Sequence, residues 1–219
     1  MDAFISTLTG NWDIFSQGFL TTIKLFVIAA AGCLVVGTVL AMMRVSPVPV
    51  LRGFGATYVN IIRNTPLTLV FAFMVFAIPK LDVNIDYFPS ACIALIVYTS
   101  AFVCEVLRSG INTVPLGQAE AARSIGLSFG QTMRMVVLPQ AFRAVIGPLG
   151  SVLIALIKNT TIAAAIGVPE AFYTMRNELQ NYGDIVIPIF AGYALFFVAL
   201  TLPAGLIFGW MARRWQVAR

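Results

Sequence analysis

Long apolar runs constrain this chain more than any other feature of its sequence. Hydrophobic residues make up 59% of the 219 residues and charged residues only 11%, whereas soluble domains average about 25% charged residues. A chain of this length cannot bury so much apolar surface within itself, so lipid must cover part of it. The first run starts near Phe19 and is too long for the core of a cleavable signal peptide. The sequence therefore predicts an integral membrane protein.

Five segments are long and apolar enough to cross a membrane, which takes about 20 residues per helix. We expect one transmembrane helix from each segment and hence an all-α bundle, with residues 1–219 forming a single domain. The second segment contains Pro66, and a polar run interrupts the fourth. The predicted spans are residues 19–43, 54–78, 88–107, 144–168 and 185–211.

The charged residues between these segments predict how the chain is oriented. Arginine dominates the first and third connections and the C-terminal tail, whereas Asp and Glu gather on the opposite side. Because connections rich in Lys and Arg stay in the cytoplasm, we expect the N-terminus outside and the C-terminus in the cytoplasm. The arginines assigned to the cytoplasmic side, with Arg63 near the membrane interface, are Arg44, Arg52, Arg63, Arg108, Arg123, Arg134, Arg143, Arg213, Arg214 and Arg219.

Several functional classes are disfavoured by what the sequence lacks. It contains no histidine, the commonest general base and metal ligand, and the predicted spans hold no nucleophile–base pair or paired carboxylates. Cys33, Cys92 and Cys104 lie in apolar runs without metal-ligand spacing, so we interpret them as packing residues. The basic residues are scattered over connections rather than gathered on a soluble scaffold, so no nucleic-acid partner is expected.

The connection between the third and fourth spans is the most informative segment. Pro115 sets a turn because its φ is fixed, and residues 118–125 suit a short helix. Gly126 suits the end of that helix, where a residue takes positive φ, and Ser128 suits the N-cap of a second short helix. We expect residues 112–136 to form two short helices with a kink. Such an element suits docking into a groove on a cytoplasmic protein, and a plain connector is the alternative.

Sequence blocks spread over nearly the whole chain resemble one family. The block in the connection resembles the EAA signature of the membrane subunits of bacterial ABC importers. The other blocks resemble the polar amino-acid permeases of the histidine, glutamate, glutamine and arginine type, with the nearest likeness to glutamate-uptake permeases. The blocks are Arg63-Asn-Thr-Pro66-Leu67, Glu105-x-x-Arg108-x-Gly110-Ile111, Gly117-Gln-x-Glu120-Ala121-Ala122 with Gly126, Leu138-Pro139-Gln-Ala-x-Arg143, and Lys158-Asn159-Thr160.

The resemblance implies a type I ABC importer permease fold in a bacterial cell membrane and a division of labour between chains. Two permease subunits, identical or homologous, would form the pathway, and an extracytoplasmic binding protein would deliver the amino acid. A cytoplasmic ATPase dimer would hold ATP and Mg, so this chain would be non-catalytic and carry no cofactor or metal. The chain has no G-x-x-x-x-G-K-[ST] loop, which fits this division. The residues implied in coupling to the ATPase are Gly117, Glu120, Ala121, Ala122, Arg123, Gly126, Leu138 and Pro139.

Charges in and near the coupling segment have expected local roles. Glu120, placed at the start of its short helix, would interact favourably with the helix dipole. Glu105 and Arg108 are three residues apart and can pair on one helix face. We expect that pair to be structural and to hold the start of the connection.

Polar side chains inside the spans are candidates for a substrate pathway, because polar groups at membrane depth are costly. The polar run at Lys158 could interrupt a helix and present its groups near mid-membrane. Alternatively, it ends the span at the outer interface, with the Lys158 ammonium reaching the headgroups. The pathway candidates are Thr65, Thr68, Tyr98, Thr99, Ser100, Lys158, Asn159, Thr160 and Thr161.

The chemistry of these candidates bears on the substrate. An acidic amino acid carries two carboxylates, and a candidate set with Lys158 but no well-placed acid favours glutamate, aspartate or their amides, although a partner permease could supply the missing charge. A secondary amino-acid transporter is an alternative, but it would need acids and histidines for ion coupling. A membrane scaffold subunit that does not transport is another, and ATP-dependent uptake distinguishes it.

Overall fold

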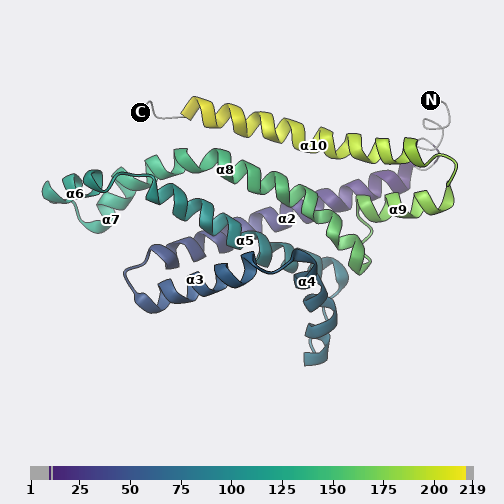
Figure 1. The fold of residues 1–219 in the computed structure, drawn as a ribbon, viewed down its shortest axis with the longest axis horizontal. Coiled ribbons are helices and arrows are strands. Elements are labelled where there is room, and N and C mark those ends of the chain that lie inside the picture. The colour runs from purple at the N-terminus through teal and green to yellow at the C-terminus, as the bar shows by residue number, and fades with distance from the viewer. Residues whose placement is uncertain (1–9, 11, 216–219) are drawn as a thin grey trace.

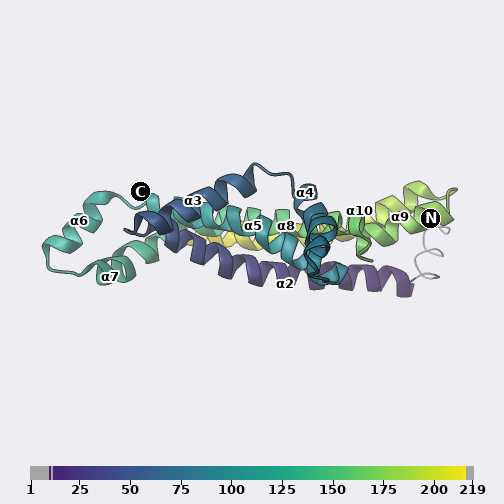
Figure 2. The same ribbon diagram turned by 90° about the horizontal axis from the view of Figure 1, so that it is seen from below.

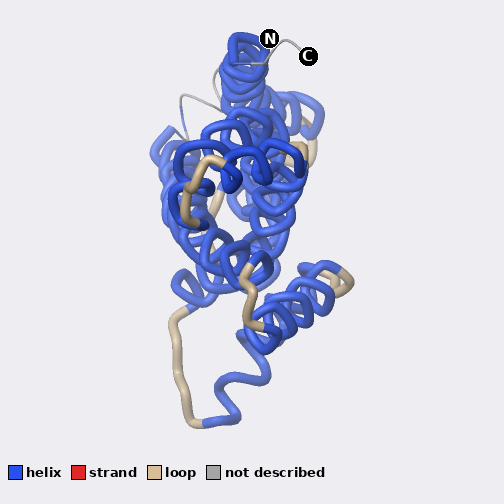
Figure 3. Tube along the Cα trace, turned by 90° about the vertical axis from the view of Figure 1, so that its left-hand side faces the viewer, coloured by secondary structure: helices blue, strands red, loops and turns tan. Residues whose placement is uncertain are grey.

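The regular structure is helical throughout the part of the chain that a computed structural model describes, residue 10 and residues 12–215 (Figure 3). The long helices run along one axis, with α6, α7 and the C-terminal end of α10 at one end and α9 at the other (Figure 1). The α-helices are α2 (Trp12–Val45), α3 (Pro49–Arg63), α4 (Leu67–Ala72), α5 (Tyr87–Asn112), α6 (Leu116–Ser124), α7 (Phe129–Thr132), α8 (Leu138–Asn159), α9 (Ala171–Asn181) and α10 (Val186–Trp215). Two π-helical segments, η1 (Phe73–Ala77) and η3 (Met133–Val137), and two 3₁₀ segments, η2 (Ile78–Leu81) and η4 (Thr160–Ile166), extend them.

Four helical segments of the described chain are long and apolar enough to cross a membrane, and a bent pair supplies a fifth. Much of their surface is apolar and exposed, as on Val35 (66%) and Leu206 (63%). Such side chains face lipid in a membrane protein, since hydrocarbon is their favourable solvent. The predicted all-α bundle of about five spans is confirmed.

Helix α5 lies at the centre of the bundle and packs against α2 and α8. Glycines allow close approach on both sides: Gly37 of α2 faces Val103, and Gly110 faces Val145 of α8. Small residues serve this purpose at helix contacts in membranes, where burial of apolar surface gives little driving force. Cys33, Cys92 and Cys104 are buried free thiols in these interfaces, as predicted for packing residues.

The second span is broken, which corrects the prediction of one helix over residues 54–78. Helices α3 and α4 meet at an angle of 102°. Pro66 causes the break, because its ring excludes a helical hydrogen bond and disfavours helical geometry at Thr65 before it. The break lies partway along the long helices, beside α5 (Figure 1).

The fourth span remains helical through the polar run that begins at Lys158, where an interruption was one of the two predictions. Helix α8 runs through Lys158 to Asn159 and passes directly into η4. The segment ends at Gly167, which takes φ of 87°. There the Gly167 and Val168 amides donate to the Ala164 and Ala163 carbonyls at 3.1 and 3.2 Å, the Schellman pattern that ends helices.

The close approach of α2 and α5 makes Gly37 sensitive to substitution. A Cβ on Gly37 would lie 2.6 Å from the Val103 Cβ and 3.0 Å from the Ser100 carbonyl oxygen. We expect Gly37→Ala to destabilise the protein by about 1–3 kcal/mol through overpacking. Gly53→Ala in α3 is the control: nothing lies within 4 Å of its added Cβ, so its stability should be unchanged or rise by up to about 1 kcal/mol. Thermal unfolding in detergent measures both, and equal midpoints would contradict this packing.

Candidate functional site

The loop between α5 and α8 has a defined backbone rather than the form of a loose connector. Helix α6 starts after Pro115 and ends where the Gly126 and Leu127 amides donate to the Arg123 and Ala122 carbonyls at 3.0 and 3.2 Å. This is a Schellman motif, and Gly126 takes the positive φ it requires, 91°. The predicted kink at Gly126 is therefore present.

The second short helix, α7, begins with a capping box. The Gln131 amide donates to the Ser128 hydroxyl at 3.4 Å, and the Ser128 amide donates to the Gln131 side-chain oxygen at 2.8 Å. This reciprocal pair satisfies two amides that a helix start leaves free. The predicted N-cap at Ser128 is confirmed.

The loop is fastened to the membrane helices at both ends. Val114 before α6, Val137 in η3 and Ala141 in α8 form a small buried cluster. Beyond this cluster, α6 and α7 project past the ends of the long helices (Figure 2). Because α8 continues η3 without a gap, a displacement of α6 and α7 would be passed directly to α8.

The projecting part of the loop presents apolar side chains and open glycines. Leu116, Ile125 and Phe129 are 80%, 78% and 67% exposed, and nothing lies within 4 Å of a Cβ placed on Gly117 or Gly126. Glycine inside a helix costs about 1 kcal/mol relative to alanine, yet nothing in the described chain explains it at Gly117. Exposed apolar surface beside unfilled space is typical of a protein–protein contact.

The predicted coupling residues are not all on that projecting surface. Gly117, Glu120, Ala121, Arg123 and Gly126 are exposed on it, but Ala122 is buried against the rest of the loop. Leu138 and Pro139 lie in the first turn of α8 instead. Glu120 is the fifth residue of α6, outside its first turn, so the predicted interaction with the helix dipole, which fades beyond that turn, is wrong.

Near the end of α5 that leads into the loop, one carboxylate forms ion pairs with three arginines from three helices. Glu105 of α5 pairs with Arg44 of α2, with Arg108 at 2.9 Å and with Arg63 of α3 at 3.8 Å. The predicted Glu105–Arg108 pair is thus present, as part of a larger cluster with two net positive charges. The Glu105 side chain is only 20% exposed.

Arg63 ends the 15-residue helix α3, about 20 Å from Pro49 at 1.5 Å per residue. Its guanidinium reaches Glu105 beside Arg44, which lies in the last turn of α2. Its guanidinium carbon lies 5.6 Å from the centre of the Phe102 ring, and its side chain is 45% exposed. The partly exposed guanidinium of Arg63 therefore lies beside the break between α3 and α4.

The predicted pathway residues fall into three groups. Thr65 and Thr68 lie at the α3–α4 break, and Tyr98 contacts Phe102, the ring beneath Arg63. Lys158, Asn159 and Thr161 are at least partly exposed at the end of α8, and the following segment η4 contacts α4. The buried candidates are Ser100, bonded to Tyr58; Thr160, bonded to the Ile157 carbonyl; and Thr99, whose hydroxyl is unpaired.

A buried acidic site at the opposite end was not predicted from the sequence, which placed Glu170 and Glu178 only among the acidic residues of the outer side. The Glu170 carboxylate caps α9, accepting from the Phe172 and Tyr173 amides at 2.9 Å each and from the Thr22 hydroxyl at 3.5 Å. Glu170 is fully buried, and burial raises its pKa from 4.5 to about 7. The position directly before a helix was the available sequence signal. Burial also raises the pKa of Glu178.

The raised pKa of Glu170 predicts a pH-dependent stability. The folded state binds this proton more tightly than the unfolded chain, so stability should fall as pH rises from about 4.5 to about 7. The loss from this residue is at most about 3 kcal/mol. Glu170→Gln keeps an oxygen acceptor but cannot titrate, so its unfolding midpoint should vary less over this range. Denaturation in detergent at pH 5 and pH 7.5 measures this, and equal pH slopes for both proteins would refute it.

A broken second span and a rigid two-helix loop on a five-span bundle define a membrane permease of the binding-protein-dependent type. Residues 33–217 match the family model of the binding-protein-dependent transport system inner membrane component, and the chain belongs to that family. It is therefore a multi-pass inner-membrane permease component. Within the described residues, no group of three or more His, Cys, Asp or Glu side chains could hold a metal.

Related permeases cover nearly the whole chain. The glutamate transport system permease protein GluC of Corynebacterium glutamicum is 47% identical over 92% of this chain and 93% of its own length. The probable glutamine ABC transporter permease protein GlnM of Bacillus subtilis is 35% identical over 96% and 97%. A chain in the crystal structure of an amino acid ABC transporter with histidines superposes with a TM-score of 0.88 at 27% identity, covering 96% of this chain and 98% of that one.

Proposed function

We propose that this permease is a subunit of an ATP-driven importer whose substrate is glutamate. The observation that carries the substrate is the 47% identity to a glutamate permease over 92% of the chain. Uptake of labelled glutamate by the reconstituted transporter, with glutamine, aspartate and arginine as competitors, tests it. Unlabelled glutamate should inhibit the uptake more strongly than any of these three. Uptake that needs an ion gradient and no ATPase would instead favour a secondary transporter, and no uptake at all would favour a scaffold.

The proposed assembly contains a second permease, identical or homologous, an ATPase dimer that holds ATP and Mg, and an extracytoplasmic binding protein. We place the loop between α5 and α8 in the cytoplasm and the N-terminus outside. The arginine bias of the connections supports this orientation. The exposed apolar residues Leu116, Ile125 and Phe129 support docking of the ATPase at this loop, with α9 facing the binding protein at the opposite end.

Arg63 is the residue best suited to the side-chain carboxylate of glutamate. Its guanidinium is partly exposed partway along the bundle, and it belongs to a cluster of three arginines around one carboxylate. Arg44 and Arg108 remain as partners for Glu105 when Arg63 turns toward a substrate. A guanidinium binds a carboxylate through two parallel hydrogen bonds, which gives geometric specificity as well as attraction.

We expect Arg63→Gln to raise the KM for glutamate uptake about tenfold or more, because it removes a charge-assisted hydrogen bond. Arg52→Gln in the same helix is the matched control, since Arg52 forms no ion pair within the described chain, and its KM should be unchanged. Initial uptake rates at varied glutamate concentration measure both. A normal KM for Arg63→Gln would remove Arg63 from the pathway.

We expect Gly126→Arg to reach the membrane but to lose both uptake and the stimulation of ATP hydrolysis by the binding protein. An arginine cannot take the φ of 91° without strain, and it would fill the open space at the kink. Gly126→Ala introduces the strain with little added volume, so its loss should be smaller. ATPase activity in nanodiscs, scored with the amount of co-purifying ATPase, measures this. Full stimulation in Gly126→Arg would make the loop a plain connector.

A further inference from the structure

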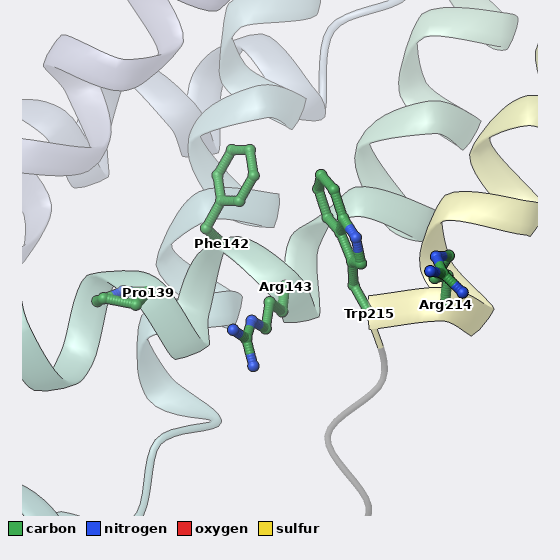
Figure 4. A pocket seen from close by; sticks show the side chains of 5 residues that line it. All are labelled: Pro139, Phe142, Arg143, Arg214 and Trp215. Atoms are coloured by element: carbon green, nitrogen blue, oxygen red, sulfur yellow. The ribbon is translucent and has the colours of Figure 1, made fainter.

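A basic cavity of about 470 Å³ lies between the first turns of α8 and the last turn of α10. Figure 4 shows its lining, in which Trp215 of α10 stands between Arg143 of α8 and Arg214 of α10. Phe142 and Pro139 complete the lining, and it contains no acidic residue. The Phe142 and Trp215 ring centres lie 6.2 Å apart.

The two arginines of this cavity carry uncompensated charge. Every ion pair within the described residues involves Glu105, so neither Arg143 nor Arg214 has an acidic partner there. An anion bound in the cavity would be attracted by both guanidinium groups. The charge of the cavity therefore favours an anionic occupant.

The surroundings of the cavity are apolar and belong to membrane spans. Trp210 and Ile207 lie four and seven residues before Arg214, on the same face of α10, and they are 59% and 56% exposed. Tryptophan at the end of a span is typical of the headgroup level of a bilayer. Exposed apolar side chains thus lie one and two helical turns before Arg214 of the cavity, which matches an amphiphile rather than a small soluble anion.

We propose that the cavity binds an anionic phospholipid, with its headgroup held by Arg143 and Arg214 on either side of Trp215 and an acyl chain along Trp210 and Ile207. Basic pockets between transmembrane helices recognise lipid headgroups in this way. Because α8 also carries the loop that projects from the bundle, the lipid would join that loop's supporting helix to α10. Its binding is independent of which substrate the permease moves.

The test is native mass spectrometry of the full-length chain, delipidated in detergent and titrated with phosphatidylglycerol or phosphatidylcholine. We expect a preference for phosphatidylglycerol, and an affinity about fivefold weaker for each of Arg143→Gln and Arg214→Gln. Phosphatidylcholine binding should not change. Arg52→Gln, which also removes a positive charge but lies in α3 outside the cavity, should keep the preference. Arg143→Lys and Arg214→Lys should retain most of it.

Three results would overturn the proposal. Equal binding of the two lipids, or an unchanged preference in both glutamine variants, would show that the cavity does not select an anionic headgroup. Displacement of phosphatidylglycerol by inorganic phosphate at comparable concentration would identify a site for soluble anions. Loss of a co-purifying protein from the glutamine variants, with phosphatidylglycerol affinity intact, would identify a protein contact instead.

Discussion

The pairing of Glu105 with Arg44, Arg63 and Arg108 holds together the part of the bundle on which the rest depends. It joins α2, α3 and α5 about two turns before α5 ends at Asn112. Removing Glu105 would leave three neighbouring arginines without a compensating charge, which is costly in a partly buried site. This contact links the C-terminal end of α3 to α2 and α5.

The Glu105 cluster also connects the loop between α5 and α8 with the break between α3 and α4. The loop is attached to α5 and α8 through the cluster of Val114, Val137 and Ala141, while α5 also carries the Glu105 cluster beside the α3–α4 break. Packed helices with such fixed attachments move as rigid bodies rather than deforming continuously. A displacement of the loop would therefore reach the break between α3 and α4, where a discontinuous helix can bind or release a polar substrate.

The sequence predicted best what local chemistry decides. The positive φ of Gly126 and the N-cap at Ser128 depend on a few neighbouring residues, and the number of spans depends on apolar run length. The contact of Arg63 with Glu105 could not be predicted in this way, because it depends on α3 turning back along the bundle at Pro49. Burial of Glu170 depends on Thr22, 148 residues away. At the polar run that begins with Lys158, the threonine hydroxyls bond to carbonyls three residues before them, and the chain passes there from α8 into the 3₁₀ segment η4.

In the proposed assembly, the loop between α5 and α8 receives the ATPase while α9 faces the binding protein. Photo-crosslinking from benzoylphenylalanine in the assembled transporter tests it most directly, with probes at Ile125 and Phe172, which are 78% and 41% exposed. We expect the Ile125 probe to capture the ATPase and the Phe172 probe to capture the binding protein. Capture of the ATPase from Phe172, or of the binding protein from Ile125, would contradict both the orientation and the role of the loop.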